Sequence, residues 1–182
     1  MVVVDIALHR SEQHSSPHGS FSEVHLIGVL PHEGEIRSRV LKLKYGKQKK
    51  IAYELAALMY KALVELDLIP QNCVVTWAPT IDARRRGRGF DQSELIARHL
   101  GVFLGCRTVK LLRRTNRQAQ SGRSRRERLN TPHFVGSGRS LADAVIVVDD
   151  VITTGATLVR AAEQLVHHGH RLVICIAASH KM

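Results

Sequence analysis

The chain has 182 residues, 44% of them hydrophobic, so it is long enough to bury one substantial core and is close to the size of a single α/β domain. No apolar run approaches the roughly 20 residues needed to cross a bilayer, and the first residues lack the pattern of a signal peptide. We therefore expect a cytoplasmic protein without a membrane partner. The three cysteines, Cys73, Cys106 and Cys175, form no CxxC pair and predict neither a disulfide framework nor a zinc site.

The formal charge of +11 is concentrated in three basic segments, residues 37–50, 84–88 and 107–128, which hold 20 of the 27 Lys and Arg and a single acid, Glu127. Such clustering favours an anionic partner, and a phosphorylated small molecule or a nucleic acid backbone satisfies it equally well. Solvated basic faces that only maintain solubility are the alternative reading. The aromatic content of 4% offers few stacking platforms for single-stranded nucleic acid.

Taken in chain order, the sequence predicts an arm followed by alternating strands and helices. Residues 1–22 carry Ser, His, Pro and Gly without periodicity, which indicates a poorly ordered arm, and a single domain is expected over residues 23–182. Apolar residues alternate over 24–30 and recur at a helical period over 47–68. Beyond these, the pattern predicts strand 73–78, helix 92–104, strand 108–112, strand 144–148, helix 156–168 and strand 171–177.

Strands that alternate with helices predict an α/β fold with a doubly wound, mainly parallel sheet. In such a fold the ligand site lies beyond the carboxyl ends of the strands. We therefore expect the polar residues that follow each predicted strand to converge at one edge of the sheet.

One segment combines a buried strand, two acids and a helix start. The run 144–148 is continuously apolar, as in a strand buried on both faces, and Asp149 and Asp150 follow it directly. Thr153-Thr154-Gly155 then predicts a compact turn, and Ala156-Thr157 begins the next helix. Carboxylates accept hydrogen bonds from a vicinal diol, while N–H groups at a helix start and Thr hydroxyls bind a phosphate. The segment therefore predicts a site for ribose 5-phosphate, against the alternative of a helix cap and an ordinary turn.

The segment 147–157, Val-Val-Asp-Asp-Val-Ile-Thr-Thr-Gly-Ala-Thr, resembles the diphosphoribosyl-binding signature of type I phosphoribosyltransferases. Other segments resemble one branch of these proteins, the competence protein F (ComF) family, and the similarity covers residues 24–178. The matching elements are Trp77-Ala-Pro-Thr80, Arg88-Gly-Phe-Asp-Gln92, Lys42-Leu-Lys-Tyr45, and Gln120 with Glu127-Arg128 and Asn130.

Two departures from the family pattern are visible. Many ComF proteins begin with a four-cysteine zinc module, which this sequence cannot supply. Asp91 also stands where Asn is common after the Arg-Gly-Phe element. If that module contacts nucleic acid or a partner in the family, this chain must use other surfaces or lack that contact.

The resemblance implies a specific set of site residues. Asp149 and Asp150 would be catalytic and hold the ribose, and the 5-phosphate would contact Thr153, Thr154, Gly155, Ala156 and Thr157. The loop 79–88 would hold the diphosphate through Pro79, Thr80, Arg84 and Arg88. The guanidinium groups of the two arginines suit phosphate oxygens. A mobile loop over residues 113–130 would close on the reacting centre, with Arg128 as its catalytic cation and Arg113, Gln120, Arg123, Arg125 and Arg126 beside it.

The implied activity is transfer of a phosphoribosyl group from 5-phosphoribosyl 1-diphosphate to a nitrogen acceptor, with release of diphosphate. Mg²⁺ is the expected cofactor; it would bridge ribose and diphosphate oxygens, and no dedicated metal-binding residue is expected. Residues 24–50 would form a small N-terminal hood for the acceptor, and a homo-oligomer is compatible with the family. The alternative function is a non-catalytic ligand sensor or a module that binds nucleic acid or a DNA-processing partner, linked to DNA uptake.

Overall fold

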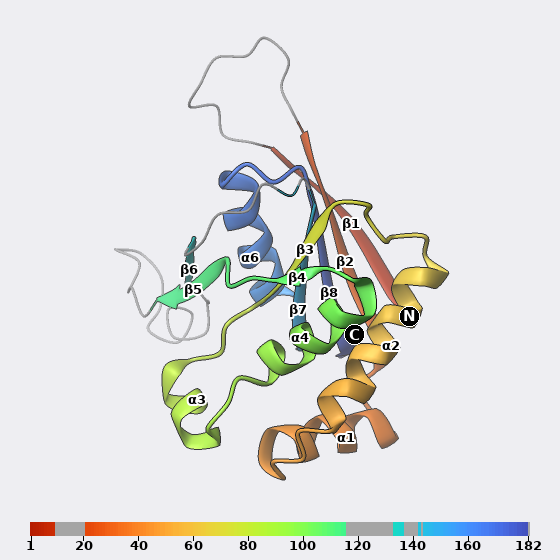
Figure 1. Ribbon diagram of the computed structural model, residues 1–182, viewed down its shortest axis with the longest axis vertical. Helices are drawn as coiled ribbons and strands as arrows, with labels where there is room; N and C mark the ends of the chain where they lie inside the picture. The colour runs from red at the N-terminus through yellow and green to blue at the C-terminus, as the bar shows by residue number, and fades with distance from the viewer. Residues whose placement is uncertain (10–20, 116–132, 137–141, 143, 182) are drawn as a thin grey trace.

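A computed structural model of the chain describes residues 1–9, 21–115, 133–136, 142 and 144–181. Its described strands form a six-stranded sheet in the order β1-β2-β8-β7-β3-β4 and a separate β5-β6 pair (Figure 1). Strands β2, β8, β7, β3 and β4 are parallel, and β1 is antiparallel to β2. The strands are β1 (Val2–His9), β2 (Phe21–Pro31), β3 (Cys73–Trp77), β4 (Arg107–Thr108), β5 (Leu112–Thr115), β6 (His133–Gly136), β7 (Ala144–Ile152) and β8 (Leu172–His180).

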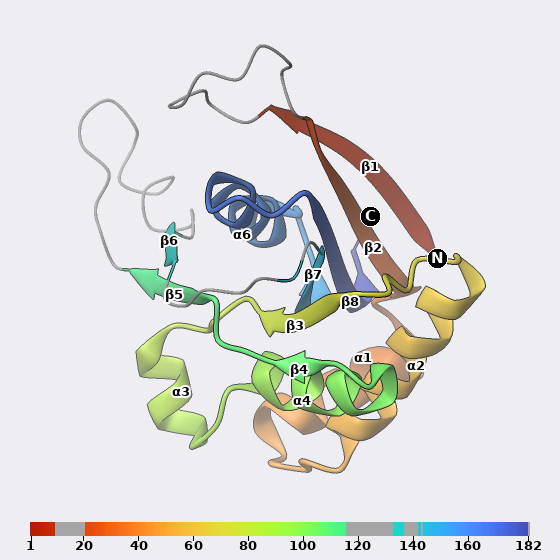
Figure 2. The ribbon, with the colours of Figure 1, turned by 45° about the horizontal axis from the view of Figure 1, so that its top comes forward.

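Helices cover both faces of the sheet, which gives three layers (Figure 2). Helix α6 lies on one face, and α1, α2 and α4 lie on the other, while α3 lies beyond the end of β3. The predicted α/β class with a mainly parallel sheet is therefore confirmed. The helices are α1 (Gly34–Tyr45), α2 (Ile51–Glu65), α3 (Asp82–Arg88), α4 (Gln92–Leu104) and α6 (Ala156–His167).

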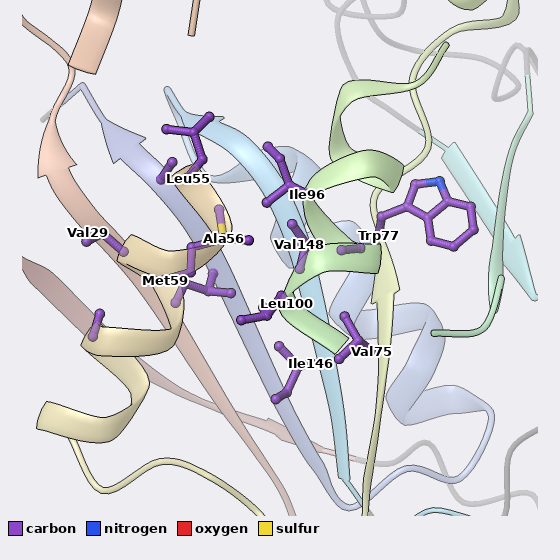
Figure 3. Close-up of a cluster of buried hydrophobic side chains, with 14 of the residues drawn as sticks. Val29, Leu55, Ala56, Met59, Val75, Trp77, Ile96, Leu100, Ile146 and Val148 are labelled. Carbon is purple, nitrogen blue, oxygen red and sulfur yellow. The ribbon is translucent and has the colours of Figure 1, made fainter. Parts of the chain in front are cut away.

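The central strand β7 is apolar on both faces because each face is covered by a helical layer. Its residues alternate between two core clusters, so that Ile146 faces the α2 and α4 side and Val147 faces the α6 side. Figure 3 shows Leu55 and Met59 of α2 and Ile96 and Leu100 of α4 packed toward the sheet, and all four are fully buried. Burial of each such side chain stabilises the fold by about 1.5–3 kcal/mol. The core thus fixes β7 between its neighbours and holds its carboxyl end in place.

The N-terminal prediction was wrong for residues 2–9. They form β1 and pair with β2 from Val2 opposite Gly28 to His9 opposite Phe21, whereas the sequence had placed them in a poorly ordered arm over residues 1–22. Apolar residues do alternate at positions 2, 4, 6 and 8, but the polar stretch that follows dominated the composition. Residues 10–20 lie outside the described part of the chain.

The predicted hood over residues 24–50 is not separate from the sheet. Its first part is β2, which pairs in parallel with β8 inside the main sheet. Its second part contains helix α1, where the sequence had predicted a loop before the helix expected over 47–68. Lys47 has a positive φ of 53°, a left-handed conformation that interrupts the helical path between α1 and α2.

The predicted loop over 79–88 also contains a helix, α3, which begins at Asp82. Gly89 ends it with a φ of 79°, a left-handed conformation that glycine adopts without strain.

The cysteine prediction missed one contact. The Sγ atoms of Cys73 and Cys106 lie 2.9 Å apart, although the two residues are 33 positions apart in the sequence. Both are free thiols, and burial raises the pKa of Cys73 to about 12. The contact therefore involves a protonated, unreactive thiol at neutral pH.

Candidate functional site

The carboxyl ends of β7 and β3 border one polar cavity of about 400 Å³, which we call the carboxylate pocket. Its walls come from α1, α4, α6 and the ends of β3, β7 and β8, so segments far apart in the sequence meet there. It is lined by His32, Val40, Leu41, Lys44, Tyr45, Ala78, Pro79, Thr80, Arg88, Gln92, Ser93, Arg114, Asp149, Asp150, Val151, Thr153, Thr157 and Lys181.

The two acids of β7 have different partners. Strand β7 continues to Ile152, so Asp149 and Asp150 lie within the strand and not after it, as the sequence had suggested. Asp149 Oδ1 accepts a hydrogen bond of 3.0 Å from Ser93 Oγ at the start of α4, and one of 2.8 Å from the backbone N–H of Asp150. Asp150 Oδ2 lies 2.9 Å from Lys44 Nζ on α1. The pair is therefore held by the two helices on one face of the sheet.

The Lys44–Asp150 ion pair is nearly removed from water. The side chains are 19% and 6% exposed, respectively, and Lys44 lies one residue after the fully buried Leu43. Two charges in such a place lose hydration, and replacing them by apolar groups is often neutral for stability. Retention of the charged pair at the wall of a cavity therefore points to a role in binding. Sequence reasoning missed Lys44, although the Lys42-Leu-Lys-Tyr45 match contains it.

Two groups of the pocket have shifted pKa values. Burial, together with the neighbouring Asp150 carboxylate, raises the pKa of Asp149 well above that of an ordinary aspartate. Burial also lowers the pKa of His32, helped by the positive charges of Lys181 and Lys44. His32 Nδ1 lies 2.8 Å from Ser179 Oγ. A neutral imidazole at neutral pH thus forms part of the wall nearest β8.

The turn after β7 is short and leads directly into helix α6, as the sequence predicted. Gly155 has φ 75° and ψ −16°, a left-handed conformation that a residue with a Cβ adopts only with strain. Helix α6 begins at Ala156, and the first N–H groups of a helix have no partner within it. The Ala156 N–H donates a long hydrogen bond of 3.5 Å to Thr154 Oγ1, which an anion could replace. Thr153 and Thr157 line the carboxylate pocket, while Thr154, Gly155 and Ala156 form the turn between them.

Pro79 and Thr80 form the opposite wall, and Asp91 fixes their position. Asp91 Oδ2 accepts a hydrogen bond of 2.9 Å from Thr80 N, and its Oδ1 accepts one of 3.1 Å from Ser93 N. Asp91 is 5% exposed, and burial raises its pKa while the N–H donors oppose that rise. Asp91 is the N-cap of α4 and ties it to the end of β3. The departure from Asn therefore has a structural explanation, because both Asp91 oxygens accept N–H hydrogen bonds and an Asn side chain has only one acceptor oxygen.

Arg88 reaches the pocket from the end of α3. Its Nη1 donates a hydrogen bond of 2.8 Å to Gln92 Oε1, and its guanidinium lies 5.2 Å from the centre of the Tyr45 ring. Both contacts orient the fork of donors at the rim. The Arg84 side chain lies outside the description, and Arg85 and Arg86 are exposed.

The structure thus brings together most of the predicted ribose and diphosphate residues. Those that line the carboxylate pocket are Pro79, Thr80, Arg88, Asp149, Asp150, Thr153 and Thr157. Arg113 lies instead in a neighbouring cavity. Of the predicted mobile loop, Gln120, Arg123, Arg125, Arg126 and Arg128 lie outside the described residues.

Two kinds of feature are absent from the described residues. None of their helices is both long and apolar enough to span a membrane. They include no group of three or more His, Cys, Asp or Glu side chains that could hold a metal ion.

No family model matches the chain. Among curated proteins, it is 27% identical over 151 residues to the DNA utilization protein YhgH of Salmonella typhi. The matched region covers 79% of this chain and 66% of that protein. The same protein of Salmonella typhimurium is 28% identical over 153 residues, with the same coverage. The competence protein ComFC of Streptococcus pneumoniae is 33% identical over 93 residues, which covers 50% of this chain and 40% of that protein. The chain therefore spans slightly under two thirds of the length of the first of these relatives.

Proposed function

We propose that this chain is a ComF-type phosphoribosyltransferase that binds 5-phosphoribosyl 1-diphosphate with Mg²⁺ in the carboxylate pocket. It would transfer the phosphoribosyl group to a nitrogen acceptor and release diphosphate. One observation carries the proposal: two carboxylates, a helix start after a left-handed glycine, and an arginine fork border the same cavity. These three features match the hydroxyls, the 5-phosphate and the diphosphate of that ligand.

Each part of the ligand has a complementary group in the pocket. Asp149 and Asp150 would accept hydrogen bonds from the ribose hydroxyls, and the turn at Gly155 would donate to the 5-phosphate. Thr80 and Arg88, on the opposite wall, would donate to the diphosphate. Lys44 would then move from Asp150 toward the ligand or share the carboxylate with a ribose hydroxyl.

The donor set of the pocket fits Mg²⁺. Two carboxylates lie in a polar cavity, and Mg²⁺ prefers oxygen ligands while keeping several of its waters. Asp149 and Asp150 would hold the hydrated ion beside the ribose. The chemistry that Mg²⁺ supplies is neutralisation of charge on the diphosphate.

The residues of the chain would act mainly by position and charge. The acceptor nitrogen forms a bond to C1 of the ribose as the bond from C1 to the diphosphate oxygen breaks, and the diphosphate leaves with the electron pair. Positive charge that develops on the ribose would be stabilised by the Asp149 and Asp150 carboxylates that line the pocket. Arg88, and Arg128 from the predicted loop, would stabilise the departing diphosphate, and closure of that loop would exclude water.

The names of the relatives favour a second candidate function. Proteins named for DNA utilization and for competence suggest that this chain acts in DNA uptake, as a ligand sensor or as a module that binds nucleic acid or a DNA-processing partner. The basic segments, with 20 of the 27 Lys and Arg, suit such a role.

Calorimetric titration with 5-phosphoribosyl 1-diphosphate and Mg²⁺, followed by a diphosphate-release assay over a panel of nitrogen bases, tests the proposal. Saturable binding with release supports the enzyme, and binding without release in any assay supports the sensor. Absence of binding refutes the proposal.

Single alanine variants of Arg123, Arg125, Arg126 and Arg128 separate the two functions further. In an enzyme, Arg128→Ala should lower turnover much more than ground-state binding, because the leaving group gains charge only as the bond breaks. In a nucleic-acid module, the four variants should lose DNA affinity almost equally, each by about one counterion in the salt dependence.

A further inference from the structure

A second cavity adjoins the carboxylate pocket on the β3–β4 side. Its volume is about 540 Å³, and we call it the basic pocket. It shares Pro79, Thr80 and Arg114 with the carboxylate pocket, so the end of β3 is a wall common to both. It is lined by Trp77, Pro79, Thr80, Asp82, Arg85, Asp91, Glu94, Arg98, Thr108, Lys110, Arg113 and Arg114.

The described lining of the basic pocket carries five basic and three acidic side chains, an excess of two positive charges. Two of the acids have basic neighbours on their own helices. Glu94 accepts a hydrogen bond of 2.7 Å from Arg98, and Asp82 lies 4.0 Å from Arg85. The third acid, Asp91, is held by the N–H groups of Thr80 and Ser93. The excess charge is contributed by the β4–β5 segment, through Lys110, Arg113 and Arg114.

Trp77 adds an apolar surface to this charged cavity. It is 6% exposed, and its indole points away from the other labelled core side chains toward the β4–β5 side (Figure 3). A cavity with one aromatic wall and an excess of cations is complementary to an organic ring that carries a dianionic group. Guanidinium and ammonium donors suit phosphate oxygens in particular.

We propose that the basic pocket is a second ligand site, which binds the phosphoryl group of a ring-bearing phosphomonoester while the carboxylate pocket is occupied. The two pockets share the Pro79–Thr80 wall, and the elements around them are close together: β7, β3 and β4 lie side by side in the sheet, and α3 and β5 lie beyond the end of β3 (Figure 2). The site requires neither Asp149 nor Asp150. The proposal therefore goes beyond the proposed function, and an experiment can refute either one without refuting the other.

The chain carries its own reporter for this site, because Trp77 is its single tryptophan and lines the basic pocket but not the carboxylate pocket. We would titrate phenyl phosphate, which has no ribose, and follow tryptophan fluorescence with saturating ribose 5-phosphate present. Phenol serves as the uncharged comparison. A saturable change with phenyl phosphate and none with phenol is expected.

The decisive comparison uses two double variants that remove the same charge, one inside the lining of the basic pocket and one outside it. Lys110→Ser with Arg113→Ser changes the basic pocket, whereas Arg107→Ser with Arg171→Ser changes exposed residues at the starts of β4 and β8. The first should weaken phenyl phosphate binding by about tenfold or more, since charge-assisted hydrogen bonds are lost. The second should leave it within about twofold, because neither Arg107 nor Arg171 lines the cavity and exposed charges are screened.

Lys110→Arg with Arg113→Lys keeps both charges and should retain binding, which guards against a serine variant that fails to fold. Equal losses of phenyl phosphate affinity in the two serine variants would show that only the overall positive charge of the protein attracts the ligand. That result would overturn the proposal. So would the absence of a saturable change, or a fluorescence change produced by an oligonucleotide but not by phenyl phosphate. If ribose 5-phosphate binding fails while phenyl phosphate binding persists, the proposed function is refuted and the second site stands.

Discussion

The carboxylate pocket and the basic pocket share the Pro79–Thr80 wall, yet they hold charge in different ways. In the carboxylate pocket, Asp150 and Lys44 form a pair that is almost wholly buried, and Asp149 is tied to Ser93. In the basic pocket, Lys110 and Arg113 are exposed. Buried charges have fixed positions and interact strongly, so they can recognise the shape of a ligand. Exposed charges are mobile and screened, so they recognise mainly its charge.

The largest expected effect comes from removing both acids. Asp149→Asn with Asp150→Asn should weaken binding of 5-phosphoribosyl 1-diphosphate by about 100-fold or more, because hydrogen bonds to charged acceptors contribute about 1.5–3 kcal/mol each. Calorimetry gives the affinity, and circular dichroism checks that the fold is retained. The same variant should leave phenyl phosphate binding in the basic pocket within about twofold. Unchanged affinity for the ribosyl ligand would remove the acids from the site.

The next effect is on stability. Lys44→Met leaves the Asp150 carboxylate buried without its cation, and it should lower the free energy of unfolding by roughly 3 kcal/mol. Lys44→Met combined with Asp150→Asn should lose clearly less than the sum of the two single changes, since no uncompensated charge remains. Urea denaturation of the three variants measures the coupling. Lys61→Met, an exposed lysine paired with Glu65 on α2, is the matched control and should change stability little. Additive losses would show that the buried ion pair does not couple the two residues.

A smaller effect is expected at the turn before α6. Gly155→Val places a branched side chain where φ is 75° and where a Cβ would lie 3.3 Å from Leu26 Cδ2. It should destabilise the protein by about 1–2 kcal/mol or somewhat more, and it should disturb the positions of the N–H donors for phosphate. Ribose 5-phosphate affinity is then reduced more than that of a nucleoside without phosphate. Gly105→Val, at another left-handed glycine after α4, controls for strain alone. If both variants bind ribose 5-phosphate equally well, the phosphate lies elsewhere.

The smallest effect concerns pH. Burial and the Asp150 charge raise the pKa of Asp149 to about 7. Below that pH the group is protonated and loses capacity to accept hydrogen bonds from ribose hydroxyls, so affinity should fall as the pH drops from about 8 to 6. Asp149→Asn should remove this part of the pH dependence and leave the part that belongs to the ligand phosphates. Identical pH profiles for the parent and the variant would contradict the assignment.

The Asp149 carboxyl should also make the stability of the fold depend on pH, and here a higher pH is unfavourable, whereas it favours ligand binding. A carboxyl whose pKa is raised by folding makes the protein less stable as the pH increases from the ordinary aspartate range, near 3.8, through about 7. Thermal unfolding should therefore show that Asp149→Asn gains stability relative to the parent as the pH increases from 5 to 8. The carboxylate pocket would then retain a carboxylate that favours binding at the expense of stability.

The segment from β7 to α6 could be predicted from the sequence because its pattern is local. A continuous apolar run, two acids, a Thr-Thr-Gly turn and a helical period are neighbours in the chain, and each reflects a short-range rule of strand burial or helix initiation. The alternation of strands and helices likewise determined the α/β class and placed the site at the carboxyl edge. The charge clusters indicated an anionic ligand, although they left its identity open.

Tertiary structure alone decided which distant side chains meet at that edge. Lys44 reaches Asp150 only because α1 packs beside the end of β7, and Ser93 reaches Asp149 only because Asp91 anchors the start of α4 to Thr80. The strand at residues 2–9 exists because β2 offers it an edge to pair with. Such contacts join residues from about ten to more than a hundred positions apart and depend on how whole layers pack, so no local pattern in the sequence specifies them.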